Sequence, residues 1–152
     1  MKCQTNISKI TQVAKREGFK IKLGKICAFN LLTSEIIMTL DDQVKETEWS
    51  LLHELGHAEL CRHNDKHHTT TIKRLRSMPK YKPTEAFYRD FLQAEWKAWE
   101  RGMKIAKREK IDISEKEYWE FANRNYQTYV DTLRSDFSFG KSPRISYIVC
   151  HK

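Results

Sequence analysis

Two histidines and a glutamate lie together near the middle of this 152-residue chain, and these residue types bind metals and move protons. His53, Glu54 and His57 form an H-E-x-x-H run. Residues four apart share one face of a helix, so both imidazoles can reach a single ion. Zn²⁺ binds neutral imidazole nitrogen, and a neighbouring carboxylate can take a proton from a zinc-bound water. The spacing therefore predicts a zinc site with Glu54 as general base, which suits hydrolysis of a peptide bond.

The alternative is that these polar residues only decorate a solvated helix face. Their neighbours argue against this because they make the segment apolar enough to bury: Trp49, Leu51, Leu52, Leu55, Ala58 and Leu60. A buried histidine pair beside a carboxylate is costly unless a cation compensates the charge. Gly56 lies between the histidines, where glycine costs about 1 kcal/mol relative to alanine in a helix. A glycine there indicates that another backbone or a substrate passes close by.

A catalytic zinc site keeps one coordination position for water, so a third protein ligand is required. His63 lies six residues after His57, but the motif that uses such a histidine has glycine where this chain has Leu60. Glu95 is the stronger candidate, because a carboxylate on a second helix facing the first completes a His₂Glu site. Trp99 lies one turn after Glu95, so its indole is expected to pack beside the ion.

Three long helices are predicted, and in the second of them the apolar side chains recur at helical spacing. They lie at about 44–62, 85–107 and 115–134, and the first two carry the histidines and Glu95. Thr84 can cap the second helix, and Ser114 with Glu117 forms a capping box for the third.

The N-terminal part is predicted to form a short helix and a small sheet. Asn6 can cap the helix and Gly18 follows its end. Three strands are expected at 19–23, 26–32 and 35–40, with a turn at 33–34. The polar segment 63–83 is expected to be a mobile basic loop with one helical turn near its middle. Together, these helices and strands predict an α+β fold. We expect one domain over residues 1–135 and a C-terminal tail over 136–152.

Composition limits the compartment and the class of protein. No apolar run approaches the roughly eighteen residues of a membrane helix, so no membrane association is expected. The N-terminus has no apolar stretch behind a basic head, which argues against a signal peptide. The four cysteines are scattered without a C-x-x-C pair, which suits a reducing, cytoplasmic environment.

Charge is distributed unevenly along the chain. The net charge is +8, yet residues 41–63 hold six acidic and two basic groups. Local negative charge around the histidines favours holding a cation, and the basic remainder would attract acidic partners. Nucleic acid is one such partner, but it is not favoured, because the sequence has neither a helix-turn-helix nor a basic motif interleaved with aromatic residues.

The run from Leu52 to Ala58, together with Glu95-x-x-Ala98 on a later helix, resembles the ImmA/IrrE family of zinc metallopeptidases. The resemblance spans about residues 19–107. It implies a minimal zincin-like core, a zinc ion, and intracellular cleavage of a regulatory protein. Many members belong to phages and mobile elements, and their substrate is often a helix-turn-helix repressor encoded nearby. This chain has Lys97 where many members have a second acid, and Trp99 where many have Asn.

The expected mechanism needs one more group, a donor that steadies the tetrahedral oxyanion. The sequence does not rank its four candidates, which are His63, His67, Tyr88 and Tyr129. A protein or peptide substrate could bind by adding a strand to an exposed sheet edge within residues 19–40.

Two other hypotheses remain open. The first is a regulatory module on a zincin scaffold with weak proteolysis, whose basic loop binds a protein or DNA. The second is a structural zinc domain closed by a fourth ligand such as Cys61 or His63. A structural site would have no use for Glu54, which ranks that hypothesis last.

Overall fold

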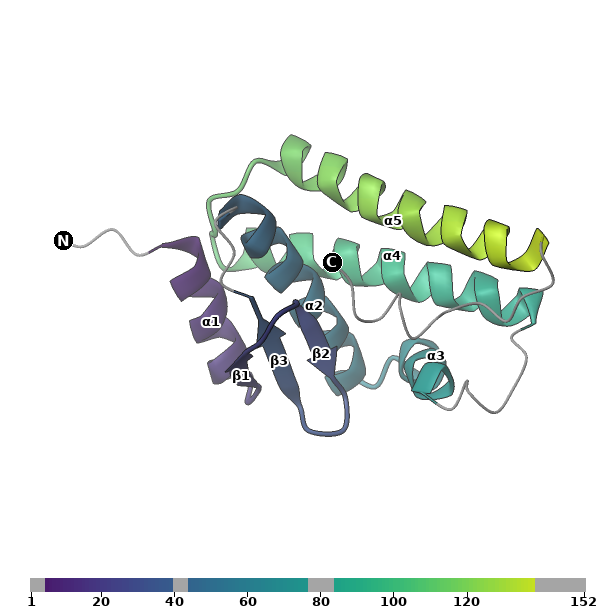
Figure 1. Ribbon diagram of the computed structural model, residues 1–152. Coiled ribbons are helices and arrows are strands. Elements are labelled where there is room, and N and C mark those ends of the chain that lie inside the picture. Colours follow the sequence, from purple (N-terminus) through teal and green to yellow (C-terminus); the bar gives the residue numbers. More distant parts are fainter. Residues whose placement is uncertain (1–4, 40–43, 77–83, 139–152) are drawn as a thin grey trace.

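The computed structural model describes residues 5–39, 44–76 and 84–138 (Figure 1). Within these ranges the elements are α1 (Asn6–Arg16), β1 (Lys20–Leu23), β2 (Ala28–Asn30), β3 (Glu35–Met38), α2 (Val44–Arg62), α3 (Lys66–Arg76), α4 (Glu85–Arg108) and α5 (Glu115–Ser138). The α+β fold predicted from the sequence is confirmed, with five helices and a small N-terminal sheet in the described residues. None of the described helices has both the length and the apolar character needed to cross a membrane.

The sheet is mixed, with strand order β1-β3-β2 (Figure 1). β1 runs parallel to β3, with Ile21 opposite Ile36, whereas β2 runs antiparallel to it, with Phe29 opposite Ile36. The predicted turn between β2 and β3 is present, and Ser34 takes the left-handed conformation that it requires, with φ of 53°. β2 is an edge strand of this sheet. α2, the helix that carries the histidines, packs on β2 and β3, whereas α1 packs on β1.

α2 is the central helix, and α4 crosses it at very short range. A Cβ on Gly56 would overlap the carbonyl oxygen of Ala98, and a Cβ on Gly102 would lie 2.6 Å from the carbonyl oxygen of Leu52. Only glycine allows two backbones to approach in this way. The prediction that another backbone passes close to Gly56 is therefore confirmed, and that backbone belongs to the helix that carries Glu95.

A buried carboxylate with two arginine partners links the same two helices nearer the C-terminal end of α2. The Glu59 carboxylate is 1% exposed and accepts hydrogen bonds from Arg101 Nε at 2.8 Å and Arg108 Nη2 at 2.6 Å. Burial raises the pKa of the Glu59 carboxyl, but the hydrogen bonds from Arg108 and Arg101 outweigh burial and hold this pKa below its usual value. The Glu59 carboxylate stays charged at neutral pH, and its bonds to the two arginines tie α2 to α4.

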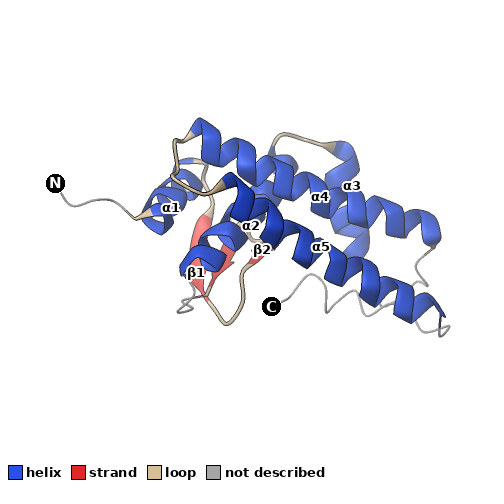
Figure 2. Ribbon diagram, turned by 90° about the horizontal axis from the view of Figure 1, so that it is seen from above, coloured by secondary structure: helices blue, strands red, loops and turns tan. Residues whose placement is uncertain are grey.

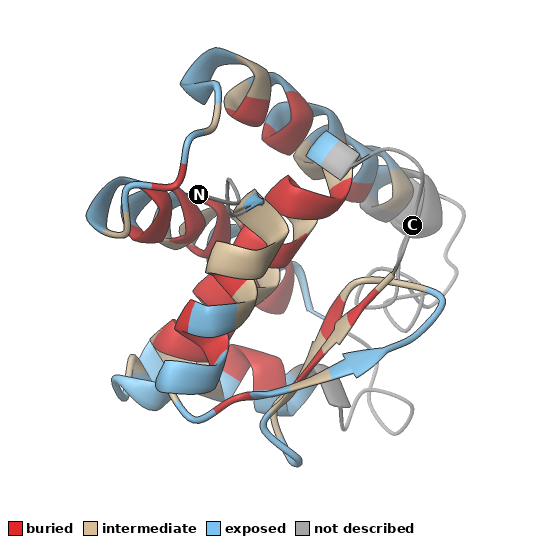
Figure 3. Ribbon diagram, turned by 90° about the vertical axis from the view of Figure 1, so that its left-hand side faces the viewer, coloured by how far each residue is buried: buried red, intermediate tan, exposed pale blue. Residues whose placement is uncertain are grey.

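α5 lies beside α4 and runs in the opposite direction (Figures 1 and 2). It continues to Ser138, so the predicted start of the tail at residue 136 falls inside the helix, and the rest of the tail lies outside the described residues. Buried positions concentrate on the inner sides of the helices, whereas their outer sides are exposed (Figure 3). α5 thus forms a second layer over the α2–α4 crossing.

The prediction of a mobile loop over 63–83 is wrong for residues 66–76, which form α3. This segment has few apolar residues and a threonine run, so its helix propensity is modest. Tertiary contacts decide its structure, because His68, Thr71 and Ile72 are buried and α3 packs on α4 and α2. Asp65 caps the helix by accepting the backbone N–H of His68 at 2.8 Å. Residues 77–83 lie outside the described part of the chain.

The caps of the other helices follow the predictions in part. Thr84 and Ser114 accept backbone N–H groups at the starts of α4 and α5, as expected. The Glu117 carboxylate, predicted to complete a capping box with Ser114, pairs with Lys45 at 3.1 Å. The cap of α1 is Thr5, not Asn6. The Asn6 amide instead donates to Glu48 and to the backbone carbonyl of Asp112, so tertiary partners take a side chain that could have capped the helix locally.

Replacing Gly56 with alanine should destabilise the fold. Alanine improves helix propensity by about 1 kcal/mol, but its methyl group would meet the α4 backbone, and overpacking of this kind costs about 1–3 kcal/mol. Urea unfolding should therefore show a lower midpoint for Gly56→Ala, while Gln93→Ala on the exposed face of α4 leaves it unchanged. A Gly56→Ala protein more stable than the parent chain would contradict the close crossing.

Candidate metal centre

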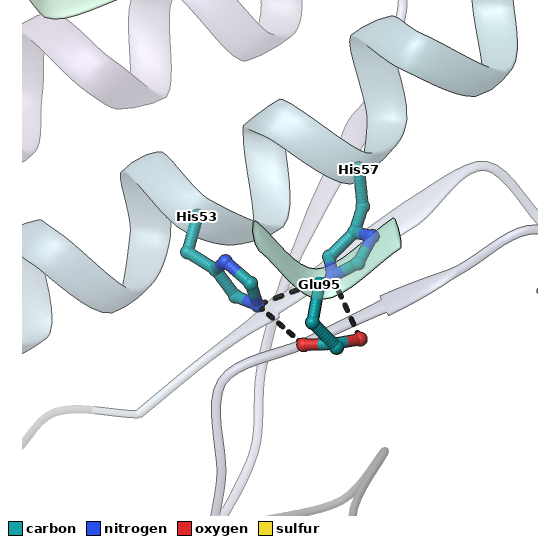
Figure 4. A group of neighbouring side chains, drawn as sticks. All are labelled: His53, His57 and Glu95. Carbon is teal, nitrogen blue, oxygen red and sulfur yellow. Dashed lines mark hydrogen bonds and ion pairs between the residues drawn. The ribbon is translucent and has the colours of Figure 1, made fainter. Parts of the chain in front are cut away.

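Three buried side chains from two helices point at one another (Figure 4). His53 and His57 come from successive turns of α2, and Glu95 comes from α4. The His53 Nε2 atom lies 3.2 Å from Glu95 Oε2, and the His57 Nε2 atom lies 3.3 Å from Glu95 Oε1. The two Nε2 atoms are 3.1 Å apart. All three residues are at most 6% exposed.

These separations fit a small tetrahedral cation. Bonds of about 2.0 Å and tetrahedral angles place neighbouring ligand atoms about 3.3 Å apart. The two imidazole nitrogens are 3.1 Å apart, and each lies 3.2–3.3 Å from a different oxygen of Glu95. Two imidazole nitrogens and one carboxylate oxygen form a donor set that zinc and other divalent transition metals accept. The geometry therefore suits a divalent cation without specifying its element.

Within the described residues, three side chains could hold a metal ion here, and one position of a tetrahedron would be left over. Cys61 and His63, the candidates for a fourth ligand, do not belong to the converging group. Cys61 is half-buried near the C-terminal end of α2, and His63 is exposed beyond that end. This arrangement matches a catalytic site, where water or substrate takes the fourth position, better than a closed structural site.

Glu95 stays ionised although it is buried. Burial raises the pKa of its carboxyl, but His57 and the hydrogen bonds from both imidazoles outweigh burial and hold this pKa well below its usual range. The carboxylate charge therefore remains available to a cation near neutral pH. Its position depends on the glycine crossing, because Ala98 lies one helical turn after Glu95.

The two histidine rings are supported in different ways. The His53 ring stacks on the indole of Trp99, with centroids 4.0 Å apart and planes 25° apart. The Trp99 carbonyl accepts a hydrogen bond of 2.8 Å from the Tyr118 hydroxyl on α5, which holds that turn of α4 in place. The expectation that Trp99 packs beside the site is confirmed. The His53 Nδ1 atom has no hydrogen-bond partner in the described part of the chain.

His57 instead contacts a third histidine, which lies in the segment predicted to be a loop. The His57 Nδ1 atom lies 3.0 Å from His68 Nε2, and His68 on α3 is fully buried. Burial lowers the pKa of His68 to about 3, and the neighbouring His57 adds to this effect, so the ring is neutral. The signal for this contact was Asp65 three residues earlier, which could have predicted a helix cap and hence an inward-facing position for His68.

Glu54 lies beside the group, in a cleft of about 110 Å³ that His53 and Trp99 also line. Its side chain is partly exposed there. Burial raises the pKa of the Glu54 carboxyl to about 7, and Glu95 adds to the rise, whereas His57 and a hydrogen bond from the Phe29 backbone oppose it. The bond from Phe29 ties this carboxyl to β2, so the outer edge of the sheet runs past the cleft.

The four oxyanion candidates lie in very different places. Tyr129 on α5 is buried and lines the same cleft as His53 and Glu54. Tyr88 is buried on α4 but does not line this cleft. His63 and His67 are exposed, and the His67 ring contacts Asp90 at 3.2 Å. The structure thus brings only Tyr129, of these four, into the cleft with Glu54.

Comparison of the chain with protein-family models, with curated proteins and with solved structures gave no match. The resemblance to the ImmA/IrrE family therefore depends on the H-E-x-x-H run and the Glu95-x-x-Ala98 segment alone.

Proposed function

We propose that this chain is a zinc-dependent metallopeptidase. The observation that supports this most is the convergence of donor atoms from His53, His57 and Glu95 within 4.8 Å of one another, with Glu54 left outside the group in an adjoining cleft. A carboxylate next to such a site, but not within it, is what hydrolysis requires and what metal storage or structural binding does not.

The roles of the residues follow from their positions. His53, His57 and Glu95 would hold the zinc ion, which when bound lowers the pKa of a water molecule and polarises a peptide carbonyl. Glu54 accepts the proton and passes it to the leaving nitrogen. A pKa near 7 suits both transfers, since the carboxyl populates its proton-accepting and proton-donating forms near neutral pH. The backbone of Phe29 keeps the carboxyl oriented toward the cleft.

Tyr129 is the proposed oxyanion donor. Burial raises the pKa of its phenol well above the usual value, and the charges of Glu95 and Glu54 raise it further. The hydroxyl therefore remains protonated and able to donate a hydrogen bond. A donor of this kind steadies the charge that develops on the substrate oxygen.

The outer edge of β2 is the proposed docking place for an extended peptide. The opposite edge strand, β1, carries Lys20 and Lys22, which discourage pairing with another strand. β2 consists of Ala28, Phe29 and Asn30 and has no such charge. Because the Phe29 backbone reaches Glu54, a strand added at this edge would pass over the cleft.

The resemblance stated above extends the proposal to the partner and the compartment. It supports a cytoplasmic regulatory protein as substrate, with a helix-turn-helix repressor as the first to try. A second candidate function is a regulatory module that binds DNA or protein, and one observation favours it. α3 contains no acidic residue and exposes Lys66, Lys73 and Arg74. Strongly salt-dependent DNA binding together with an idle zinc site would support that alternative.

Removing the third ligand should remove the metal. The parent protein should carry about one zinc per chain, and Glu95→Ala should bind zinc far more weakly, because two imidazoles alone do not satisfy the ion. Elemental analysis after dialysis measures this. Glu100→Ala, on an exposed part of the same helix, is the matched control and should retain the metal. Equal zinc content in the Glu95→Ala protein would exclude Glu95 as a ligand.

Replacing Glu54 with glutamine should separate binding from chemistry. The amide cannot accept the proton, so cleavage of a peptide library, followed by mass spectrometry, should fall below detection while zinc content is unchanged. Glu46→Gln changes another carboxylate that lines the same cleft and should remain active. Undiminished cleavage by the Glu54→Gln protein would contradict the proposed mechanism.

Loss of the Tyr129 hydroxyl should lower kcat without affecting the metal. Removal of one oxyanion donor typically reduces kcat by about 10²–10³-fold, and Tyr129→Phe should fall in that range with little change in KM. Tyr126→Phe, one turn earlier on α5 and packed against Trp96, serves as the control. If both variants cleave peptides at the parental rate, another group stabilises the oxyanion.

A further inference from the structure

His68 lies directly behind one of the proposed metal ligands, on the side away from Glu95. Its Nε2 atom is 3.0 Å from Nδ1 of His57, while the opposite nitrogen of the His57 ring, Nε2, faces Glu95 at 3.3 Å. The two rings are tilted by 35°, with centroids 5.0 Å apart. Both side chains are buried, so water does not compete for this hydrogen bond.

This contact determines where the protons must lie. A histidine that binds a cation through Nε2 carries its proton on Nδ1 and must donate that proton to an acceptor. The acceptor available to His57 is the Nε2 lone pair of His68. His68 must then be neutral, with its own proton on Nδ1.

The imidazole at position 68 is costly as a mere packing residue. In the tautomer that accepts from His57, the His68 Nδ1 atom carries a proton, yet this atom has no hydrogen-bond partner among the described residues. A buried unpaired donor costs about 1–3 kcal/mol. Leucine would fill a similar volume without that cost, so the fold alone does not account for a histidine here.

The position of His68 is secured from the helix that supplies Glu95. Asp65 caps α3 through the backbone N–H of His68, and Lys97 on α4 lies 3.6 Å from the Asp65 carboxylate. Lys97 is two residues after Glu95 in the same helix. α4 therefore positions the groups on both sides of the His57 ring, because it carries Glu95 on one side and holds His68 on the other through Lys97 and Asp65.

We propose that His68 is a positioning residue that, as a neutral acceptor, sets the tautomer and the orientation of His57 for a divalent cation. His53 has no equivalent partner in the described chain and depends on stacking against Trp99 instead. The role of His68 rests on the proposed metal site and adds to it a part that the H-E-x-x-H pattern does not contain.

Zinc binding to the full chain tests this directly, by competition with a chromophoric chelator. Loss of a hydrogen-bond partner to a metal ligand typically weakens binding about 10- to 100-fold, and His68→Leu should fall in that range. His68→Gln places an amide oxygen near the position of the imidazole Nε2 atom and should restore affinity to within a few-fold of the parent. His67→Leu, at the exposed neighbouring position, should bind zinc as the parent does.

Thermal unfolding of the metal-free proteins separates positioning from packing. Because leucine removes a buried unpaired donor, metal-free His68→Leu should unfold at the parental temperature or above it. A nitrogen-correlated proton spectrum of the zinc-loaded parent should show His57 protonated at Nδ1 in slow exchange with water, and His68→Leu should lose that protection.

Each result supports or overturns the inference. A parent chain that binds no zinc overturns the proposed function and the role of His68 together. Zinc binding by the parent with equal affinity in His68→Leu overturns the role of His68 alone. Weaker zinc binding accompanied by a lower unfolding temperature of the metal-free variant, without rescue by His68→Gln, assigns His68 to packing and also overturns the inference.

Discussion

The contact of two helix backbones at Gly56 and Gly102 is the constraint on which the site depends. These glycines let α4 approach α2 without intervening side chains, and Glu95 reaches the histidines only from that short distance. Gly56 lies between the two histidines in sequence, so α4 approaches α2 most closely at the turn that carries the imidazoles. Glu59 and its two arginines hold the same helices together further along, and fix the angle at which they cross.

The charge on the site is balanced by its surroundings in an asymmetric way. Glu95 is a buried anion held between two imidazoles. Glu54 is a second carboxyl, and burial raises its pKa to about 7, so near neutral pH it carries only part of a negative charge. One negative charge in the ligand group favours a cation, while a second full charge beside it would be costly to bury. His68 contributes a hydrogen-bond acceptor for His57 without adding a charge. A carboxylate at this position would also accept the bond but would add another negative charge.

The remaining elements surround this centre. The segment just before β2 lines the cleft at Cys27, and α5 brings Tyr129 to it, so the cleft forms between this segment, α2, α4 and α5. α3 supports His57 from behind. The three candidate ligands themselves come from only two helices.

Periodicity predicted the helix that carries Glu95, because its apolar side chains recur at helical spacing and its cap is local. The helix that carries His53 and His57 has almost no amphipathic face, and it was predicted from the spacing of the histidines and their apolar neighbours. The glycine signal at position 56 was also local, since an unfavourable residue in a helix needs an external reason. Three features were decided only by tertiary contacts. α3 forms because α2 and α4 bury one of its faces, despite its weak propensity, and Asn6 gives up capping for distant partners. The third is the environment of each polar side chain. Chain spacing does not encode which of several histidines and tyrosines faces His57 or the cleft, because that depends on how helices distant in sequence pack.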